Sequence, residues 1–246
     1  MRRVVWMAGA LVALLVAGRV WEAAMWNRDA RRDPVPGRRV GSRQIYCTGS
    51  GSPTVILESG LGDALEQWRL VQPGVSEFAR VFHGRYGAEV VGAVLVDAVQ
   101  EDQYKVLPGW EGIAAPMRAR YRRQARWAWL EVEFGILRLR LWMEGIGAPY
   151  RLLQAKFFRT RWSELEQMEV SAEQARAAGG LGSKPLLVLT GERGALRGWK
   201  EVQERLTALS TDRKWVVLAD SGHDVPADRP DAVIAAIREV AAKAAR

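Results

Sequence analysis

The hydrophobic pattern of residues 39–246 predicts strands that alternate with helices. Apolar runs rich in Val, Leu and Ile are typical of strands buried in a parallel sheet, and four are present, at residues 54–57, 90–96, 185–190 and 214–219. Helical spacing of apolar residues follows at 64–79, 199–209 and 231–245. Two further short strands, at 39–42 and 44–47, are expected to form a hairpin. The alternation predicts the α/β class with a parallel sheet.

A change of pattern between residues 113 and 183 predicts a helical cap inserted into the α/β core. This stretch is rich in Arg, Trp, Leu and Glu, keeps helical spacing and carries almost no strand signal. We expect two to four helices there, with a break near residues 145–149. The expected organisation is therefore a first core segment (39–112), the cap (113–183) and a second core segment (184–246).

The first 26 residues predict a membrane anchor or a signal segment. Arg2 and Arg3 precede an apolar run that ends at Arg19, and this run is shorter than the roughly 20 residues of a usual membrane span. We favour an uncleaved single-pass anchor, with a cleaved signal peptide as the alternative. Arg2 and Arg3 favour a cytoplasmic N-terminus and hence an extracytoplasmic domain, whereas the arginines of the 27–38 linker favour the opposite orientation.

Composition narrows the classes of function. The chain has 246 residues, 48% of them hydrophobic, which suffices for one domain with a full core and an appendage. One cysteine, Cys47, excludes an internal disulfide framework, and two histidines, His83 and His223, argue against a multi-histidine metal site. We therefore expect no metal and no cofactor. The net charge of +8 permits contact with anionic membranes, but no nucleic-acid-binding motif is present, so we expect no nucleic-acid partner.

Three features follow predicted strands, at the positions where open parallel sheets bind ligands. Gly60 and Leu61 lie in a glycine-rich loop after the first buried strand, Asp97 ends the next, and His223 follows the last. Backbone N–H groups in such a loop can stabilise an oxyanion, and an Asp that orients a His is half of a catalytic triad. Each feature alone is more often structural, as a turn, a strand-end cap or a loop histidine.

Together and in this order, the features resemble the α/β-hydrolase superfamily, and in particular a bacterial group with an N-terminal hydrophobic anchor. The resemblance rests on residues 47–62, 84–97, 185–191 and 221–231. It implies that His223 is the general base, that Leu61 with its neighbour Gly60 forms the oxyanion hole, and that the helical cap is a lid.

The resemblance offers two positions for the triad acid. Many members carry Asp in a Gly-x-x-Asp turn after the penultimate strand, but here that turn ends in Gly194 and offers only Glu192. Other members carry the acid after the strand that follows the nucleophile helix, where this chain has Asp97. We prefer Asp97 and keep Glu192 as the alternative; Asp224 is a poor candidate because neighbours in a loop rarely face each other.

The nucleophile of the family has no counterpart in this chain. No G-x-S-x-G turn is present, and relatives carry about two more βα units, roughly 50 to 60 residues, between segments that match 79–81 and 84–86. No serine of the chain qualifies as a substitute, including Ser50 and Ser52 in the turn cluster, Ser59 in the oxyanion loop and Ser221 beside the base. We expect the strand at 54–57 to pair with that at 90–96 across the gap, in a centrally shortened sheet of reduced stability.

The resemblance implies hydrolysis of an ester or similar acyl bond in a small apolar substrate by a Ser-His-Asp mechanism. As written, the chain would be an impaired or inactive member. The alternative is a noncatalytic, membrane-attached protein that binds a ligand in the apolar cleft. A third hypothesis is an active enzyme whose written sequence lacks a segment, which the nucleotide sequence across residues 80–84 would test. The basic, Trp-rich cap fits a lid or a surface that meets anionic lipid.

Overall fold

The computed structural model describes residues 1–41, 43–61, 63, 65–77, 80–82, 90–147 and 150–244. The chain forms two compact units. One consists of Met1–Pro36 and Ala114–Glu166, and the other of Gly37–Ile113 and Gln167–Arg246. Residues 80–84 are where the sequence predicts the missing segment. Of these, residues 83 and 84 lie outside the described residues, and His83 is therefore not described.

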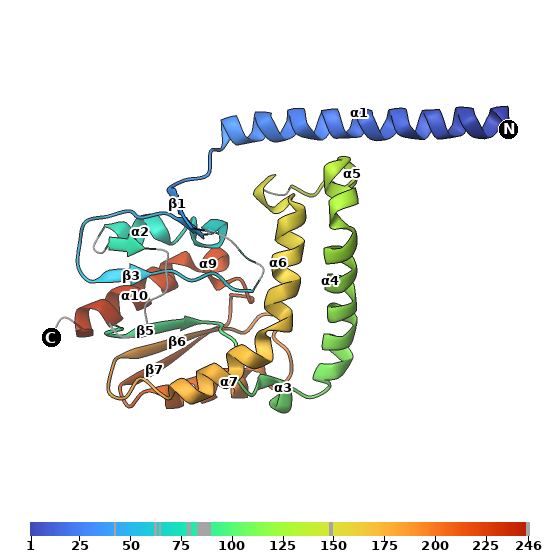
Figure 1. The fold of residues 1–246 in the computed structure, drawn as a ribbon. Coiled ribbons are helices and arrows are strands. Elements are labelled where there is room, and N and C mark those ends of the chain that lie inside the picture. The colour runs from blue at the N-terminus through green and yellow to red at the C-terminus, as the bar shows by residue number, and fades with distance from the viewer. Residues whose placement is uncertain are drawn as a thin grey trace. The chain divides into compact units, whose positions relative to one another are not determined.

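The larger unit has the predicted α/β architecture (Figure 1). Its strands are β1 (Arg38–Val40), β2 (Arg43–Ile45), β3 (Thr54–Ile56), β4 (Arg80–Phe82), β5 (Ala93–Val96), β6 (Leu186–Gly191) and β7 (Arg213–Leu218). Its helices are α2 (Gln72–Ser76), α3 (Gln103–Val106), α7 (Met168–Ala178), α8 (Trp199–Leu206), α9 (Val225–Asp228) and α10 (Pro230–Ala244), with 3-10 turns η1 (Leu65–Trp68) and η3 (Thr207–Leu209). The hairpin of β1 and β2 is antiparallel, as expected.

The parallel strands fall into two separate sheets. β5, β6 and β7 pair in that order, with Val94 opposite Leu187. β3 and β4 form the second sheet, with Val55 opposite Val81. The predicted pairing of residues 54–57 with 90–96 is therefore wrong. Residues 80–82 form an additional strand that is nearer to β3 along the chain, so that this pairing closes a shorter loop at a lower entropic cost.

One apolar core connects the two sheets. Leu57, just after β3, belongs to the same buried cluster as Leu187 and Leu189 of β6, together with apolar residues of α2 and α10. Because strand side chains alternate, Leu186 and Val188 belong instead to a second cluster with residues of α8 and η3. α10, which Figure 1 shows beside β5, therefore covers one face of the three-stranded sheet. α8 packs on the other face.

The smaller unit is helical. It contains α1 (Arg2–Arg32), most of α4 (Trp110–Glu133), α5 (Ile136–Met143), η2 (Tyr150–Leu152) and α6 (Ala155–Glu166). Together with α7, the described part of the 113–183 stretch has four helices, where the sequence predicts two to four. α6 and α7 belong to different units, so the compact units divide this stretch at residue 166.

α1 is a single helix that continues six residues into the segment for which the sequence predicts a linker. Its length and apolar composition suffice to cross a membrane, and a signal sequence near the N-terminus would meet the same criteria. The large apolar side chains of its first half are exposed, among them Val4, Trp6, Leu11, Val12, Leu14 and Val16.

Arg138 of α5 fixes the second half of α1. Its guanidinium donates to both carboxylate oxygens of Glu22, at 2.7 and 2.9 Å, and to Asp29 Oδ2 at 2.6 Å. The side chains of Arg138 and Glu22 are only 15% and 8% exposed. The backbones approach closely beside this site, since a Cβ at Gly18 would lie 2.5 Å from the carbonyl oxygen of Phe134. A bidentate, largely buried pair of this kind is specific in geometry.

Replacing Arg138 by Ala should destabilise the full chain by about 3 kcal/mol, because it leaves the Glu22 carboxylate buried without its cation. Chemical denaturation of the detergent-solubilised protein, followed by Trp fluorescence, measures this effect. Arg140→Ala is the control. Arg140 lies on the same helix and pairs with Glu131 at 3.4 Å, but both side chains are at least 40% exposed, so the expected loss is below about 1 kcal/mol. Equal losses for the two variants would contradict a specific role for Arg138.

Amide exchange should reveal the free edge of β5. The N–H groups of Ala93 and Asp97 donate to β6, so in a parallel ladder Leu95 does the same, whereas Val94 and Val96 face the opposite edge. No described strand pairs with that edge. Hydrogen exchange measured by NMR should therefore be faster at Val94 and Val96 than at Leu95. Equal protection at all three residues would mean that another segment pairs with this edge.

Candidate functional site

His223 and Asp97 meet at the carboxyl ends of the three-stranded sheet. His223 lies in the loop after β7, and its Nδ1 is 2.6 Å from Asp97 Oδ2. The imidazole is 82% exposed, whereas the carboxylate is 2% exposed. An ionised Asp accepts a hydrogen bond from Nδ1–H and thereby leaves Nε2 as the basic nitrogen, and the described residues offer Nε2 no hydrogen-bond partner. The pair has the arrangement of a catalytic base and its orienting acid.

Asp97 is held by two further hydrogen bonds. Its Oδ1 accepts from Trp199 Nε1 at 2.8 Å and from the backbone N–H of Gly191 at 3.2 Å. Its backbone has φ +44°, a left-handed conformation that Asp tolerates better than most residues. The buried carboxylate is therefore satisfied on both oxygens. Sequence reasoning missed Trp199, which carries no signal beyond an aromatic residue at the start of a helix.

The end of β6 supports the loop that carries His223. A Cβ at Gly191 would lie 2.0 Å from the carbonyl oxygen of Gly222, so only glycine permits this approach. The Arg193 N–H donates to Ser221 O at 2.8 Å, and its guanidinium binds Asp228 Oδ2 at 2.8 Å. The same oxygen accepts from the Gly222 N–H at 2.7 Å, so the loop is held on both sides of its turn.

The pKa of His223 is raised above its ordinary value of 6.5, chiefly by the hydrogen bond to Asp97, while partial burial opposes the shift. The charges of Asp97, Asp63 and Asp224 add to the increase. Because the pKa in the folded state exceeds that in the unfolded state, the interaction stabilises the fold below pH 6.5 and weakens as the pH rises through the folded-state value. The imidazolium that forms during base catalysis would be stabilised in the same way.

Glu192, the alternative acid, makes a different contact. Its carboxylate forms an ion pair with Lys200 of α8 and is 41% exposed. Asp224 lies at the start of α9 without a side-chain hydrogen bond that caps this helix, and it acts on His223 only through its charge. The structure thus brings Asp97, and neither Glu192 nor Asp224, into hydrogen-bonding contact with His223.

The predicted oxyanion loop follows β3, in the other parallel sheet. The Gly60 N–H donates to Gln67 Oε1 at 3.0 Å, and the Gly60 carbonyl accepts from the Asp63 N–H at 3.0 Å. Gly60 is therefore engaged within the loop, while the described residues offer the Leu61 N–H no partner. Leu61 is therefore the better donor candidate of the two.

The described residues contain no nucleophile bonded to His223. Ser221 is completely buried, and its hydroxyl donates to the Gly222 carbonyl at 3.0 Å. Ser59 lies partly buried in the loop after β3, and Ser50 and Ser52 are exposed. The hydrogen bonds of the His223 side chain reach Asp97 and no other described residue.

No family model and no curated protein match the chain, but solved structures do. A proposed epoxide hydrolase from Pseudomonas aeruginosa is 18% identical, with a TM-score of 0.55 over 82% of this chain and 92% of that one. A proposed ancestral haloalkane dehalogenase is 15% identical, with a TM-score of 0.57 over 85% and 99%. DbjA is 18% identical, with a TM-score of 0.56 over 85% and 97%. At such low identity these likenesses establish the fold, and the chain has the α/β-hydrolase fold.

Replacing Asp97 by Asn should lower the pKa of His223, because the charged acceptor that favours the imidazolium is lost. An NMR titration of the His223 ring protons measures the shift, and Glu192→Gln is the matched control because Glu192 does not contact the ring. A pKa that is unchanged in Asp97→Asn, or lowered equally in Glu192→Gln, would contradict the assignment of Asp97 as the partner of His223.

Proposed function

We propose that the chain is an ester or acyl hydrolase of the α/β-hydrolase superfamily that has lost its nucleophile and is impaired or inactive. His223 is the base, Asp97 the acid and Leu61 the remaining oxyanion donor. The observation that carries the proposal is the contact between His223 and Asp97 at 2.6 Å, in a sequence without a G-x-S-x-G turn. Support comes from β3 and β5, each of which has an edge with which no described strand pairs, as expected if the nucleophile strand of relatives lies between them.

The remaining groups can still support slow chemistry. Neutral His223 can take a proton from water through Nε2 while the water oxygen attacks an ester carbonyl, and Asp97 then stabilises the imidazolium. When the tetrahedral intermediate collapses, the ester C–O bond breaks and the imidazolium returns the proton to the leaving alcohol. The Leu61 N–H would donate to the oxyanion. Without a covalent intermediate, only modest catalysis is expected. The similar structures are named an epoxide hydrolase and a haloalkane dehalogenase, and these names are compatible with a small apolar substrate for this chain. In the same proposal, α1 is the membrane attachment and the helices of 113–183 are the lid.

The first test is reaction of the full chain with a fluorophosphonate, followed by intact-mass analysis. We expect no adduct, because such probes react with a serine that a base has activated. His223→Ala is the control. A stoichiometric adduct on the original protein that disappears in His223→Ala would show that an activated serine exists and would overturn the proposal.

The rate of hydrolysis of an activated ester distinguishes the impaired enzyme from the noncatalytic ligand-binding protein. An impaired enzyme should give a slow rate that His223→Ala removes. A ligand-binding protein without turnover should give the rate of buffer alone with both proteins, while still binding a nonhydrolysable analogue of the ester in calorimetry.

A further inference from the structure

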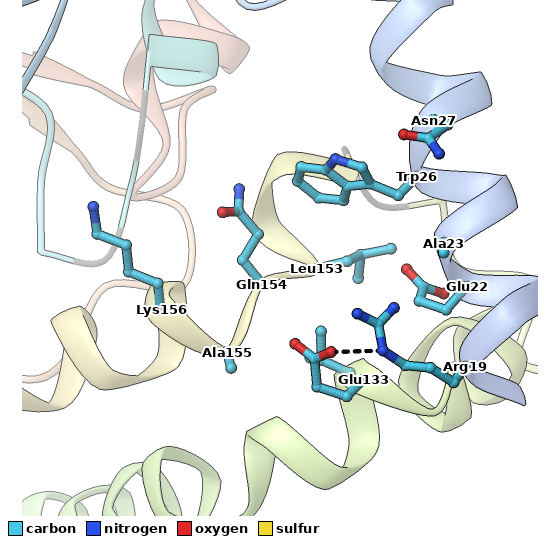
Figure 2. Close-up of a pocket in the computed structure, with 11 residues that line it drawn as sticks. Arg19, Glu22, Ala23, Trp26, Asn27, Glu133, Leu153, Gln154, Ala155 and Lys156 are labelled. Atoms are coloured by element: carbon cyan, nitrogen blue, oxygen red, sulfur yellow. Dashed lines mark ion pairs between the residues drawn. The ribbon is translucent and has the colours of Figure 1, made fainter. Parts of the chain in front are cut away.

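A cavity of about 410 Å³ lies within the helical unit, between α1, the end of α4 and the start of α6 (Figure 2). This volume falls in the range of about 300–1,000 Å³ that is typical of small-molecule sites. α1 contributes Arg19, Glu22, Ala23, Trp26 and Asn27 to its walls. Val132 and Glu133 of α4, and the segment 153–156, complete the lining.

The carboxylates of the cavity are already neutralised. Glu22 accepts two hydrogen bonds from Arg138, and Glu133 pairs with Arg19 at 3.1 Å, which Figure 2 marks with a dashed line. Lys156 lines the same cavity, and no described residue forms an ion pair with it. The cavity therefore offers a ligand one uncompensated positive charge and no uncompensated negative charge.

The remaining walls are suited to an acyl chain. Ala23, Val132, Leu153 and Ala155 are apolar. Trp26 is fixed by an edge-to-face contact with Tyr150, at 4.8 Å between ring centroids. The Trp26 indole N–H has no hydrogen-bond partner among the described residues, so it can donate to a polar headgroup, as Trp residues do at membrane interfaces.

The cavity is continuous with the apolar half of α1. The exposed apolar side chains of α1 extend from Val4 to Trp21, past Arg19, which lines the cavity. A large exposed apolar surface of this kind requires cover from a bilayer or a partner. If the bilayer covers it, as proposed above, a lipid that lies against α1 needs only to move along the helix to reach Lys156 and Trp26.

We propose that this cavity binds one anionic phospholipid, whose phosphate meets Lys156 and the Trp26 indole and whose chain lies against Ala23, Val132 and Leu153. The anionic headgroup matches the positive charge of Lys156, and the apolar chain matches the apolar side chains of the cavity wall. This site is separate from His223 and Asp97, and its occupancy does not depend on hydrolysis. It does rest on the proposed membrane attachment of α1.

The test is native mass spectrometry of the full chain, released from nanodiscs of phosphatidylcholine alone or mixed with phosphatidylglycerol. We expect one phosphatidylglycerol to remain bound, in preference to phosphatidylcholine. Lys156→Ala should weaken this retention by roughly tenfold, the loss of one charge-assisted contact. Arg159→Ala is the matched control, since Arg159 is a cation on the same helix that does not line the cavity, and it should leave retention unchanged.

A second variant, Ala23→Trp, fills the cavity and should abolish retention while circular dichroism remains that of the original protein. Equal retention in Lys156→Ala and Arg159→Ala, or no preference for phosphatidylglycerol, would overturn the proposal. Displacement of the lipid by added palmitate at equal concentration would overturn the phospholipid assignment in favour of a free fatty acid. Liposome flotation separately tests membrane attachment, and the fluorophosphonate experiment remains independent of both.

Discussion

Apolar packing, and not backbone pairing, holds the two parallel sheets of this α/β-hydrolase fold together. Among the described strands, none pairs with the second edge of β3 or of β5, and the buried cluster that contains Leu57, Leu187 and Leu189 connects the two sheets. In an intact sheet, strand ladders fix the spacing and register of neighbouring strands. Here the spacing depends on how the side chains of α2 and α10 fill the interior. Hydrophobic packing is less directional than hydrogen bonding, so this junction is less constrained than a strand ladder would be.

The division of the sheet separates the elements of the site. His223, Asp97 and Trp199 all belong to elements of the three-stranded sheet, and Gly191 at the end of β6 fixes the loop between them. The proposed oxyanion loop with Leu61 follows β3, which belongs to the two-stranded parallel sheet. The contact between His223 and Asp97 therefore forms without the nucleophile strand. The position of the proposed oxyanion donor relative to His223 depends instead on packing between the two sheets. The proposed impairment would fit this division, because catalysis requires tight placement of both groups.

The features that the sequence predicts correctly are local. Runs of Val, Leu and Ile identify β3, β5, β6 and β7, and the position of Asp97 directly after β5 places its carboxylate where the last loop can reach it. β4 was missed because three residues without flanking turn signals give no strand pattern, and its formation depends on the free edge of β3. Trp199 and Arg138 were also missed. Their contacts join residues more than 100 positions apart, which no local pattern reveals.

The two halves of α1 differ in the distribution of charged residues. Its first half is apolar around the whole circumference, which is typical of a helix in a bilayer. Arg19, Glu22 and Asp29 lie three and seven residues apart and hence on one face, the face that meets Glu133 and Arg138. Cleavage after Gly18 would leave these contacts intact but would remove the apolar half, together with the close approach of Gly18 to Phe134. Cleavage after Ala24 would also remove Glu22 and leave Arg138 with half of its partners. The proposed membrane attachment would keep all of these contacts of α1, and either cleavage would remove some of them.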